Sequence, residues 1–433
     1  MTIAGVPEFR VGDPIIGATL ALRRDPLTVL LAPYRRFGRL FRMRVFGREH
    51  LVIAGVEANE FAWADADQWD WARSGAVFRE QFGANYLTQL GGDAHSEKRK
   101  RLSPAFRTRA LARLAPSMAD VWTDELTRLD GEVVDLRQLC KRLVVRMAGR
   151  ALLRVDLPPG TEDEISALEH DLLAGAAMGP LRNAWFSRPS YRARKRRVEK
   201  LLTTIVRERR ADWTGDDMLS EVLRAWPDRA QIASVEELVS DMVLLLQAGS
   251  ESTAHQILWG VLLLAAHPEW REELRGSLAS WSPDTAAAPE HRELRATVLE
   301  VERLRPVIPH ALRVTAHDLV FADTHIAAGT SVYQPTTLPH FLDEIYRDPM
   351  RFQPVRFLGS NEYPRAAHAA FGGGSHVCLG QPLARLEEPL ALAIITSQFD
   401  IELRNPINLT ARLSGVVSPV DRAIPVLVRR RRS

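Results

Sequence analysis

The spacing of apolar residues along the chain predicts a mainly helical protein. From Glu57 onward, apolar positions recur at helical intervals among Ala, Leu, Glu and Arg, and the clearest examples are residues 111–129, 136–153 and 235–266. The last of these segments contains no proline, begins after Ser234 and ends before Pro268, which are start and stop signals for a helix. Such a helix is about 48 Å long at about 1.5 Å per residue. We therefore expect it to cross the whole molecule.

Short segments at both ends of the chain predict strands. Phe41–Gly47 and His50–Gly55 alternate apolar and polar residues or run β-branched, and they predict a hairpin with a turn at residues 47–49. Further strands are expected at residues 319–321, 325–327 and 331–333 and in the tail after Phe399. We expect one domain over residues 1–433, mainly α with a minor β part. Its parts are a β-rich segment at about 35–56, a helical core at about 57–310 and mixed strands at about 311–433.

Composition and charge exclude several classes of protein. Apolar residues make up 46% of the 433, which indicates a globular chain. The net charge is +3, and Arg429–Arg432 carry four positive charges, so global charge gives nucleic-acid binding no support. The N-terminus lacks a signal-peptide pattern, and no apolar stretch is long enough to span a bilayer. Cys140 and Cys378 form no metal-finger pair; one bridge between them stays open, but a reduced cytoplasmic protein is favoured.

The middle of the long helix is unexpectedly polar. Residues 247–253, QAGSEST, interrupt an otherwise apolar run with small polar side chains and one acid. A helix that is buried on most sides has no structural need for such residues, because a buried polar group costs free energy unless it has a partner. We therefore expect a polar ligand or solvent beside this segment.

A glycine-rich segment, FGGGSHVCLG at Phe371–Gly380, contains one of the two cysteines. Three glycines permit a tight backbone path, and Pro382 with the apolar periodicity after it predicts a helix that begins just beyond Cys378. A helix N-terminus stabilises a thiolate. Taken alone, the segment also fits a small buried cysteine, a phosphate-binding loop without its Gly-Lys-Ser/Thr ending, or a cysteine nucleophile beside His376.

The segment resembles the heme-binding signature of the cytochrome P-450 superfamily, and the chain is similar to soluble bacterial members. The signature is Phe, two residues, Gly, three residues, Cys, one residue and Gly, and its fixed positions are matched by Phe371, Gly374, Cys378 and Gly380. His376 fills a position where the family has Arg or His. The resemblance implies heme b as cofactor and Cys378 as the axial ligand of its iron. A thiolate ligand favours O–O cleavage.

A second resemblance lies upstream of the cysteine. Glu300 and Arg303 share one helix face, and alone they predict a solvent-exposed pair. In the family, an E-x-x-R helix precedes a Phe-x-Pro-x-Arg-Phe segment, and here residues 352–357 supply that segment with Arg356. The resemblance implies that Glu300, Arg303 and Arg356 form a buried structural network.

The resemblance also implies which residues hold the heme propionates. His95 and Arg99 lie four residues apart, on one helix face, and alone they predict a solvated basic helix. The family has such a pair on a helix that binds a propionate, and Arg313 and His376 match two further positions. Charge-assisted pairing with carboxylates explains why these positions are basic.

Residues 248–253, AGSEST, are similar to the family's oxygen-binding stretch. Gly249 is implied to make room for dioxygen, and Glu251, Ser252 and Thr253 are the candidate catalytic residues, with Glu251 and Ser252 delivering protons. Ser252 stands where the family usually has Thr, although a hydroxyl is retained.

The implied fold is the P-450 triangular prism of helices around a long central helix. The implied reaction inserts one oxygen atom from dioxygen into a small hydrophobic substrate, as in the tailoring of a natural product. The pocket is expected from apolar and aromatic segments at residues 69–90, 174–185, 244–252, 307–312 and 415–418. The alternatives are a peroxygenase, desaturase or coupling enzyme on the same scaffold, and a non-catalytic heme sensor.

The implied partners are a ferredoxin and its NAD(P)H-dependent reductase. We expect an acidic ferredoxin to dock near Lys98, Lys100, Arg101 and Arg385, which flank the cysteine loop in the implied fold. We further expect a monomer without nucleic-acid partners or a transmembrane segment.

Overall fold

The computed structural model of the protein describes residues 5–176, 178, 181–211, 215–226, 234–282, 288–359 and 363–432. Its helices are α1 (Thr19–Arg24), α2 (Pro26–Phe37), α3 (Val56–Ala64), α4 (Trp71–Ser74), α5 (Ala76–Phe82), α6 (Gly92–Leu102), α7 (Thr108–Ala112), α8 (Ala115–Arg128), α9 (Leu136–Leu153), α10 (Thr161–Ala176), α11 (Arg182–Phe186), α12 (Pro189–Ala211), α13 (Met218–Arg224), α14 (Val235–Ala266), α15 (Pro268–Ser277), α16 (Arg292–Leu304) and α17 (Gln381–Gln398). The expectation of a mainly helical protein is confirmed.

The strands are short and belong to four small sheets. They are β1 (Glu8–Phe9), β2 (Leu40–Val45), β3 (Arg48–Ile53), β4 (Val133–Asp135), β5 (Ala311–Val314), β6 (Leu319–Phe321), β7 (Thr324–Ile326), β8 (Ser331–Gln334), β9 (Phe399–Leu403), β10 (Ala411–Ser414), β11 (Val416–Pro419) and β12 (Pro425–Arg430). The largest sheet has the order β1-β2-β3-β8-β5, and the others are β4-β12-β9, β6-β7 and β10-β11. The five-stranded sheet therefore joins the N-terminal hairpin to strands that follow α16.

The predicted hairpin is present, but its turn is one position earlier than expected. β2 and β3 pair antiparallel, with Val45 opposite Arg48. Phe46 and Gly47 both have positive φ, which is the geometry of the tight turns that fit the twist of a hairpin. Arg48 and Glu49, which the sequence assigned to the turn, therefore belong to the second strand.

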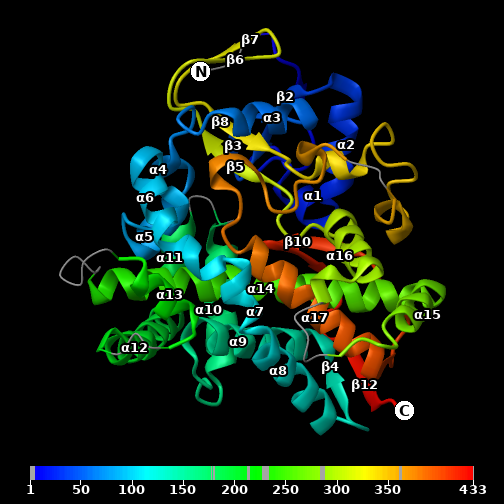
Figure 1. Cartoon of the computed structure of the whole chain (residues 1–433). Coiled ribbons are helices and arrows are strands. Elements are labelled where there is room, and N and C mark those ends of the chain that lie inside the picture. Colours follow the sequence, from blue (N-terminus) through cyan, green and yellow to red (C-terminus); the bar gives the residue numbers. More distant parts are fainter. Residues whose placement is uncertain are drawn as a thin grey trace.

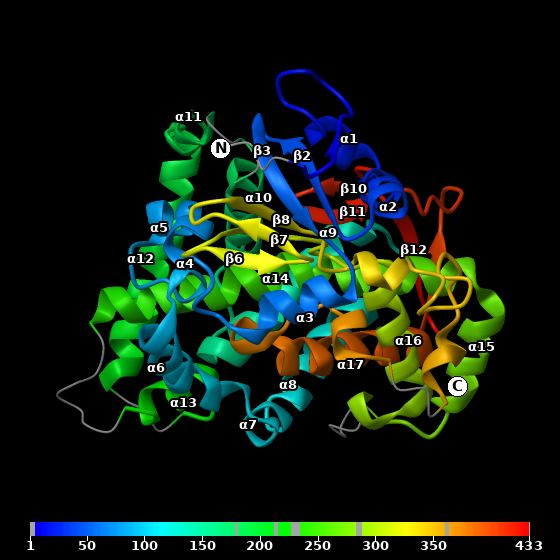
Figure 2. The ribbon, with the colours of Figure 1, turned by 90° about the horizontal axis from the view of Figure 1, so that it is seen from above.

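The predicted long helix is confirmed as α14, and it lies at the centre of the molecule. The side chain of Ser234 accepts a hydrogen bond from the N–H of Glu237, and His267, directly before Pro268, caps the other end. The helix packs against α9, α10, α12, α16 and α17. It runs across the middle of the ribbon, with the five-stranded sheet on one side of it and α8 and α9 on the other (Figure 1). Seen from above, it again crosses the middle of the molecule (Figure 2).

One predicted helix is wrong in its extent. Residues 111–129 do not form a single helix, because α7 ends at Ala112 and α8 begins at Ala115. Pro116 stands in the first turn of α8, where its missing N–H costs no hydrogen bond. The break therefore places a helix start where the apolar pattern alone suggested continuity.

Candidate active site

The loop before α17 brings Cys378 to the start of that helix. The N–H of Cys378 donates to the carbonyl of Phe371 over 3.0 Å, which closes the loop on itself. Gly374 has a φ of 68°, a left-handed conformation that side chains rarely adopt. A Cβ at the neighbouring Gly373 would lie 2.3 Å from the ring of Trp63 on α3. These glycines are therefore required by the backbone path and by the close approach of α3.

The environment of Cys378 favours its thiolate form over that of the other cysteine. Cys378 is exposed at its tip and Cys140 is buried, and both are free, so the bridge that the sequence left open is absent. Burial raises the pKa of the Cys378 thiol, and the N–H groups of Gly380 and Gln381 and the guanidinium of Arg99 offset this only in part. Burial, with a smaller contribution from Asp135, raises the pKa of Cys140 to about 12. Of the two thiols, Cys378 is therefore the accessible one, and it has neighbours that favour its anionic form.

Two histidines stack beside the cysteine loop. The ring of His376 lies between Trp71, with ring centroids 3.4 Å apart, and His95, with centroids 3.7 Å apart. Its Nε2 lies 3.0 Å from the carbonyl oxygen of Leu90. Burial lowers the pKa of His376 to about 4. The stack fixes α6 against the loop, so residues almost 300 positions apart form one wall of the site.

Two arginines complete a basic cluster around this stack. Arg313 lies over the rings of Trp69 and Trp71, and its Nε donates to the side chain of Gln334 over 2.8 Å. Burial lowers the pKa of Arg313 to about 10 and also lowers that of Arg99. Within the described residues, neither guanidinium has a carboxylate within ion-pair distance. Buried cations without an anion are costly, so this cluster fits an anionic ligand.

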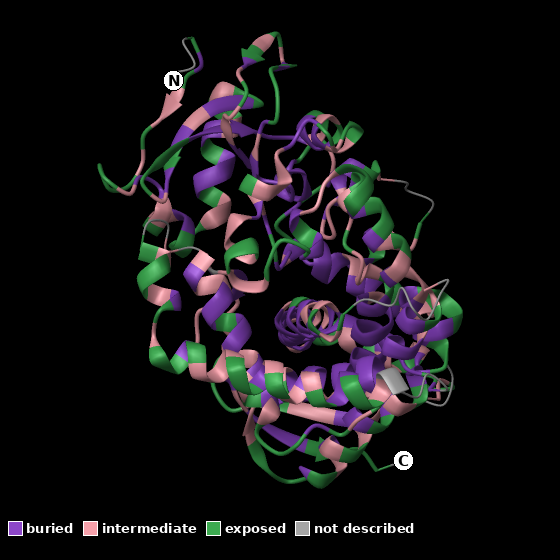
Figure 3. Cartoon of the chain, turned by 90° about the vertical axis from the view of Figure 1, so that its left-hand side faces the viewer, coloured by how far each residue is buried: buried purple, intermediate pink, exposed green. Residues whose placement is uncertain are grey.

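The centre of α14 has an accessible stripe along one side. Leu245, Ala248, Gly249 and Ser252 occupy positions i, i+3, i+4 and i+7, and all are at least partly exposed, whereas most of the helix is buried. Figure 3 looks along this helix and shows the mostly buried coil with its lighter side. A Cβ added at Gly249 meets no atom within 4 Å. There is therefore space next to α14 at the polar segment 247–253.

The three candidate catalytic residues do not face the same way. The hydroxyl of Ser252 lies on the accessible stripe and donates to the carbonyl of Ala248 over 2.7 Å. Glu251 and Thr253 are buried. The carboxylate of Glu251 faces α9, where Lys141 Nζ lies 2.7 Å away. Adjacent residues on a helix point about 100° apart, so Glu251 and Ser252 make no direct hydrogen bond.

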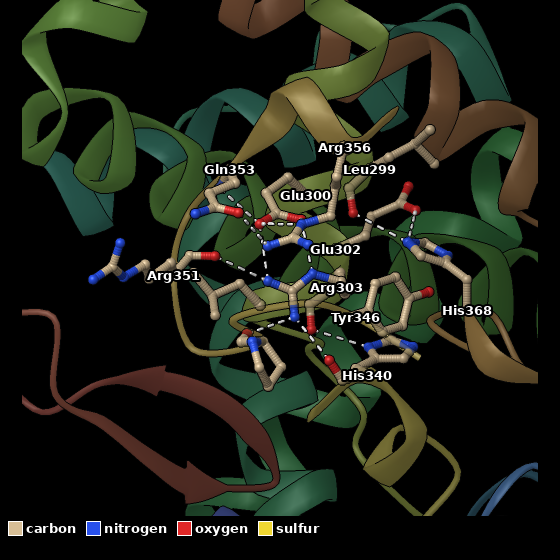
Figure 4. Close-up of polar contacts among 12 residues, drawn as sticks. Leu299, Glu300, Glu302, Arg303, His340, Tyr346, Arg351, Gln353, Arg356 and His368 are labelled. Atoms are coloured by element: carbon tan, nitrogen blue, oxygen red, sulfur yellow. Dashed lines mark hydrogen bonds and ion pairs between the residues drawn. The ribbon is translucent and has the colours of Figure 1, made fainter. Parts of the chain in front are cut away.

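Glu300, Arg303 and Arg356 lie in one buried network (Figure 4). Arg303 contacts both carboxylate oxygens of Glu300 at 2.7 and 2.8 Å, and Arg356 Nε lies 3.1 Å from the same carboxylate. The remaining donors of Arg303 contact the carbonyls of His340, Pro349 and Arg351. A single arginine therefore fixes two stretches of the chain, at His340 and at Pro349 to Arg351, to α16. Taken alone, the pair suggested a solvent-exposed surface contact, and that interpretation is wrong.

The structure corrects one residue of the expected docking surface. Lys98 is buried, and its ammonium lies 2.7 Å from Asp241 on α14 and donates to the carbonyl of Asn85 over 2.6 Å. Its position on α6 turns it inward rather than toward solvent. Lys98 is therefore a structural link between α6 and α14 and is not available to a partner protein. Lys100 is exposed, and Arg101 and Arg385 are partly exposed.

A family model for cytochrome P450 matches residues 7–424. The chain belongs to the cytochrome P450 family. Among curated proteins it is 29% identical over 405 residues to the cyclooctat-9-en-7-ol 5-monooxygenase of Streptomyces melanosporofaciens, covering 89% of this chain and 87% of that protein. It is 29% identical over 431 residues to the putative cytochrome P450 120 of Synechocystis, covering 96% and 95%. As a cytochrome P450 it is a monooxygenase with heme b as cofactor.

Solved cytochrome P450 structures have the same fold. The retinoic acid bound cyanobacterial CYP120A1 aligns with a TM-score of 0.86 at 26% identity, covering 98% of this chain and 99% of that one. The heme domain of cytochrome P450DA, at 20% identity, aligns with a TM-score of 0.84 over 100% and 99% of the chains, which shows the fold alone. The predicted P450 fold is confirmed. Within the described residues, no helix combines the length and the apolar character needed to cross a membrane.

The residues of the site fit heme b. A thiol at a helix start, a basic cluster without its own carboxylates and an accessible stripe on α14 match an iron ligand, two propionates and a flat ring. Sequence reasoning did not identify Trp63 and Trp71 as parts of the loop's support. The sequence shows these two residues only as aromatic side chains near predicted turns. Aromatic side chains pack in many parts of a protein, so this position did not indicate contact with the cysteine loop.

Proposed function

We propose that this P450 oxidises a hydrophobic small molecule in the tailoring of a natural product. The observation that carries the proposal is the accessible stripe of α14, where apolar Leu245 and Ala248 adjoin the polar Ser252. Ile308, before β5, and Leu312, in β5, are also unusually exposed for their size, at 43% and 38%. Apolar surface beside a few polar groups is typical of small-molecule sites. Of the five expected pocket segments, residues 174–185 lie partly outside the described residues.

The relatives support the same substrate class. One is named for the 5-oxidation of cyclooctat-9-en-7-ol, and another was solved with retinoic acid bound. Both compounds are hydrophobic. We therefore propose a substrate of similar polarity, and hydroxylation is the first outcome to test. Desaturation, coupling and peroxide-driven oxidation remain as alternatives on the same scaffold.

The protein's residues have separate tasks in this proposal. Cys378 binds the iron, and the loop residues Phe371, Gly374 and Gly380 hold the path that presents it. His95, Arg99, Arg313 and His376 bind the propionates, because their charges and donors converge without protein carboxylates. When bound, heme supplies the activation of dioxygen. Gly249 leaves room beside α14, where dioxygen would fit.

Proton movement is assigned to two residues of α14. Ser252 holds a proton at Oγ on the accessible stripe, and Glu251 supplies protons from the buried side. Because the two side chains diverge, we propose that a water or a substrate hydroxyl connects them. Thr253 is buried on another face and serves as the alternative relay.

Electrons are proposed to come from a ferredoxin and its NAD(P)H-dependent reductase. Lys100, Arg101 and Arg385 form the docking surface, and Lys98 is not part of it. α6 contributes His95 to the wall of the site and α7 packs against α17, so this surface flanks the cysteine loop. The protein is proposed to act as a monomer.

A spectral screen of the purified, heme-loaded protein tests the substrate class. Retinoic acid, cyclooctat-9-en-7-ol and polar counterparts of similar size are titrated, and the spin shift of the Soret band is recorded. We expect hydrophobic compounds to give saturable shifts and an oxygenated product with NAD(P)H, ferredoxin and reductase. Shifts only with polar compounds would contradict the proposal. Turnover with peroxide alone would favour a peroxygenase, and binding without any product would favour a heme sensor.

A further inference from the structure

A buried glutamate on α10 contacts the centre of α14. Glu169 is 4% exposed, and its Oε2 accepts a hydrogen bond of 2.9 Å from the backbone N–H of Glu251. This N–H lies in the middle of a 32-residue helix. In a regular α-helix it donates to the carbonyl four residues earlier, which here belongs to Gln247. The carboxyl group of Glu169 therefore competes with the helix's own backbone at the turn that contains Gly249.

The same turn has other signs of an open backbone. Gly249 has no side chain to pack and costs helix stability relative to alanine. The side-chain amide of Gln247 is buried, and neither its nitrogen nor its oxygen has a hydrogen-bond partner within the described residues. Unpartnered buried polar atoms are rare and indicate ordered water or a functional site. Glu169 thus caps a weak point of α14 next to the proposed proton-delivery residues.

The charges around Glu169 form an asymmetric cluster. Lys141 on α9 pairs with Glu251 at 2.7 Å, and His255 Nδ1 lies 3.5 Å from the same carboxylate. Arg137 of α9 lies 3.2 Å from the other nitrogen of His255, and Tyr86 faces Glu169 from the segment before α6. Burial lowers the pKa of His255 to about 4, so its ring is neutral. Lys141 therefore pairs directly with Glu251 and acts on Glu169 only through its more distant charge.

Burial and the neighbouring Glu251 raise the pKa of Glu169 well above its usual value, and Lys141 only partly offsets this. Glu251, by contrast, has the direct ion pair with Lys141, and its Oε2 has no partner within the described residues. Glu169 is therefore the member of the pair whose neutral form the surroundings favour.

We propose that Glu169 is a positioning residue for oxygen activation, which holds the central turn of α14 open and stores the proton that Glu251 passes on. The proton moves from the carboxyl group of Glu169 to the carboxylate of Glu251, and Glu169 regains a proton from solvent. This inference rests on the proposed role of Glu251. It also connects α10 to α14, so that a shift of α10 changes the turn beside the site.

Amide hydrogen exchange on the heme-loaded protein tests the positioning part without any substrate. Glu169→Leu removes the acceptor, so exchange of the Glu251 amide should accelerate about tenfold, as expected when one hydrogen bond is lost. Glu169→Gln keeps an acceptor oxygen and should change it little. The matched control is Glu162→Gln, which breaks another buried contact between α10 and α9, to Arg146. Unchanged exchange in Glu169→Leu would overturn the positioning role.

Infrared spectroscopy tests the stored proton. At neutral pH the wild type should show a carboxylic acid C=O band that Glu169→Gln lacks and Glu162→Gln retains. This band should disappear as the pH rises, because Glu169 then loses its proton. If Glu169→Gln loses no such band, the carboxyl group is ionised and the storage role fails.

Coupling measurements separate this inference from the proposed function. With the compound that gives the largest spin shift in the screen, Glu251→Gln and Glu169→Gln should both lower the ratio of product to NAD(P)H consumed. Coupling in the wild type should fall as the pH rises, whereas coupling in Glu169→Gln should be low and nearly independent of pH. If coupling falls in Glu251→Gln but not in Glu169→Gln, the role of Glu169 is rejected and the proton relay through Glu251 is kept. If coupling does not fall in Glu251→Gln, the relay itself is rejected.

Discussion

At the scale of single residues, the hydroxyl of Ser252 is the polar side chain that the α14 stripe offers to the site. Its donation to the carbonyl of Ala248 holds it near the helix, and without the methyl group of threonine its rotamer is less restricted. We predict that Ser252→Ala lowers the ratio of product to NAD(P)H consumed and releases more peroxide. Ser252→Thr should maintain or raise that ratio. Equal coupling in wild type and Ser252→Ala would leave Thr253 or a substrate hydroxyl as the relay.

Arg303 is predicted to be structural rather than catalytic. Its side chain is fully buried, and its loss leaves the Glu300 carboxylate and three carbonyls short of donors. Breaking a buried pair in this way costs about 3–5 kcal/mol. Arg303→Ala should therefore yield heme-free or misfolded protein, whereas Arg295→Ala, at an exposed position of the same helix, should load heme normally. A folded, heme-replete Arg303→Ala variant would contradict this role.

The sequence predicted which residues belong to the site better than it predicted where their side chains point. The cysteine signature and the E-x-x-R pair are local patterns, so their members could be named without a structure. Glu169, Lys141 and Trp71 could not, because their roles depend on packing between elements distant in sequence. Lys98 was assigned to the surface because lysines are almost never fully buried without a partner, and its partner Asp241 was invisible in the local pattern.

At the scale of elements, α9 and α14 have the predicted bounds because their ends carry explicit signals. Asp135 caps α9 and Ser234 caps α14 with side-chain hydrogen bonds, and Pro268 excludes further extension of α14. The break between α7 and α8 has no such signal except Pro116, which also fits inside a first turn. Periodicity alone therefore predicts which segments are helical more securely than where neighbouring helices separate.

Two histidines beside Tyr333 of the five-stranded sheet, His50 in β3 and His310 directly before β5, predict acid sensitivity. His310 stacks on Tyr333 with ring centroids 4.7 Å apart, and His50 of β3 approaches the same ring. Burial lowers the pKa of both histidines to about 4. A histidine in the unfolded chain has a pKa of about 6.5. Between this pH and about pH 4, the unfolded chain therefore binds protons that the native protein does not. Stability is therefore full above that range and falls as the pH drops toward 4.

We predict that His310→Leu weakens this pH dependence. Each such histidine contributes up to about 1.4 kcal/mol per pH unit within the window, and the variant removes one of them. The measurement is the urea midpoint of unfolding between about pH 7 and about pH 4.5. His325→Leu, at an exposed position of β7, is the control and should follow the wild type. An equally steep acid loss in His310→Leu would show that this cluster does not set the sensitivity.

At the scale of the whole molecule, the order of motifs along the chain predicted the architecture. Five motifs follow one another: the hairpin, the His-x-x-x-Arg helix, the long helix, the E-x-x-R helix and the cysteine loop. Each motif taken alone fits other kinds of protein, but together they fit one fold. The structure and the family match agree with that order. Substrate identity does not follow from it, because the pocket is formed by side chains from segments that no shared motif constrains.

Electron delivery is predicted to depend on ionic strength. Lys100 and Arg101 lie on the face that flanks the cysteine loop, and an acidic ferredoxin is attracted to them over distances that shrink to about 8 Å at physiological salt. The combined Lys100→Glu and Arg101→Glu reversal should slow reduction about tenfold or more at low salt. Arg48→Glu, on the N-terminal hairpin, should not. If the reduction rate changes with neither the salt concentration nor the charge reversal, the docking surface lies elsewhere.

The central claim, that this chain holds heme through Cys378, is tested most directly by the spectrum of the ferrous carbon monoxide complex. Thiolate ligation gives a strongly red-shifted Soret band, which the wild type should show. Cys378→Ala should abolish that band, and Cys140→Ala should retain it, because Cys140 is buried and burial raises its pKa to about 12. A red-shifted band that survives in Cys378→Ala, or that is lost in Cys140→Ala, would contradict the account.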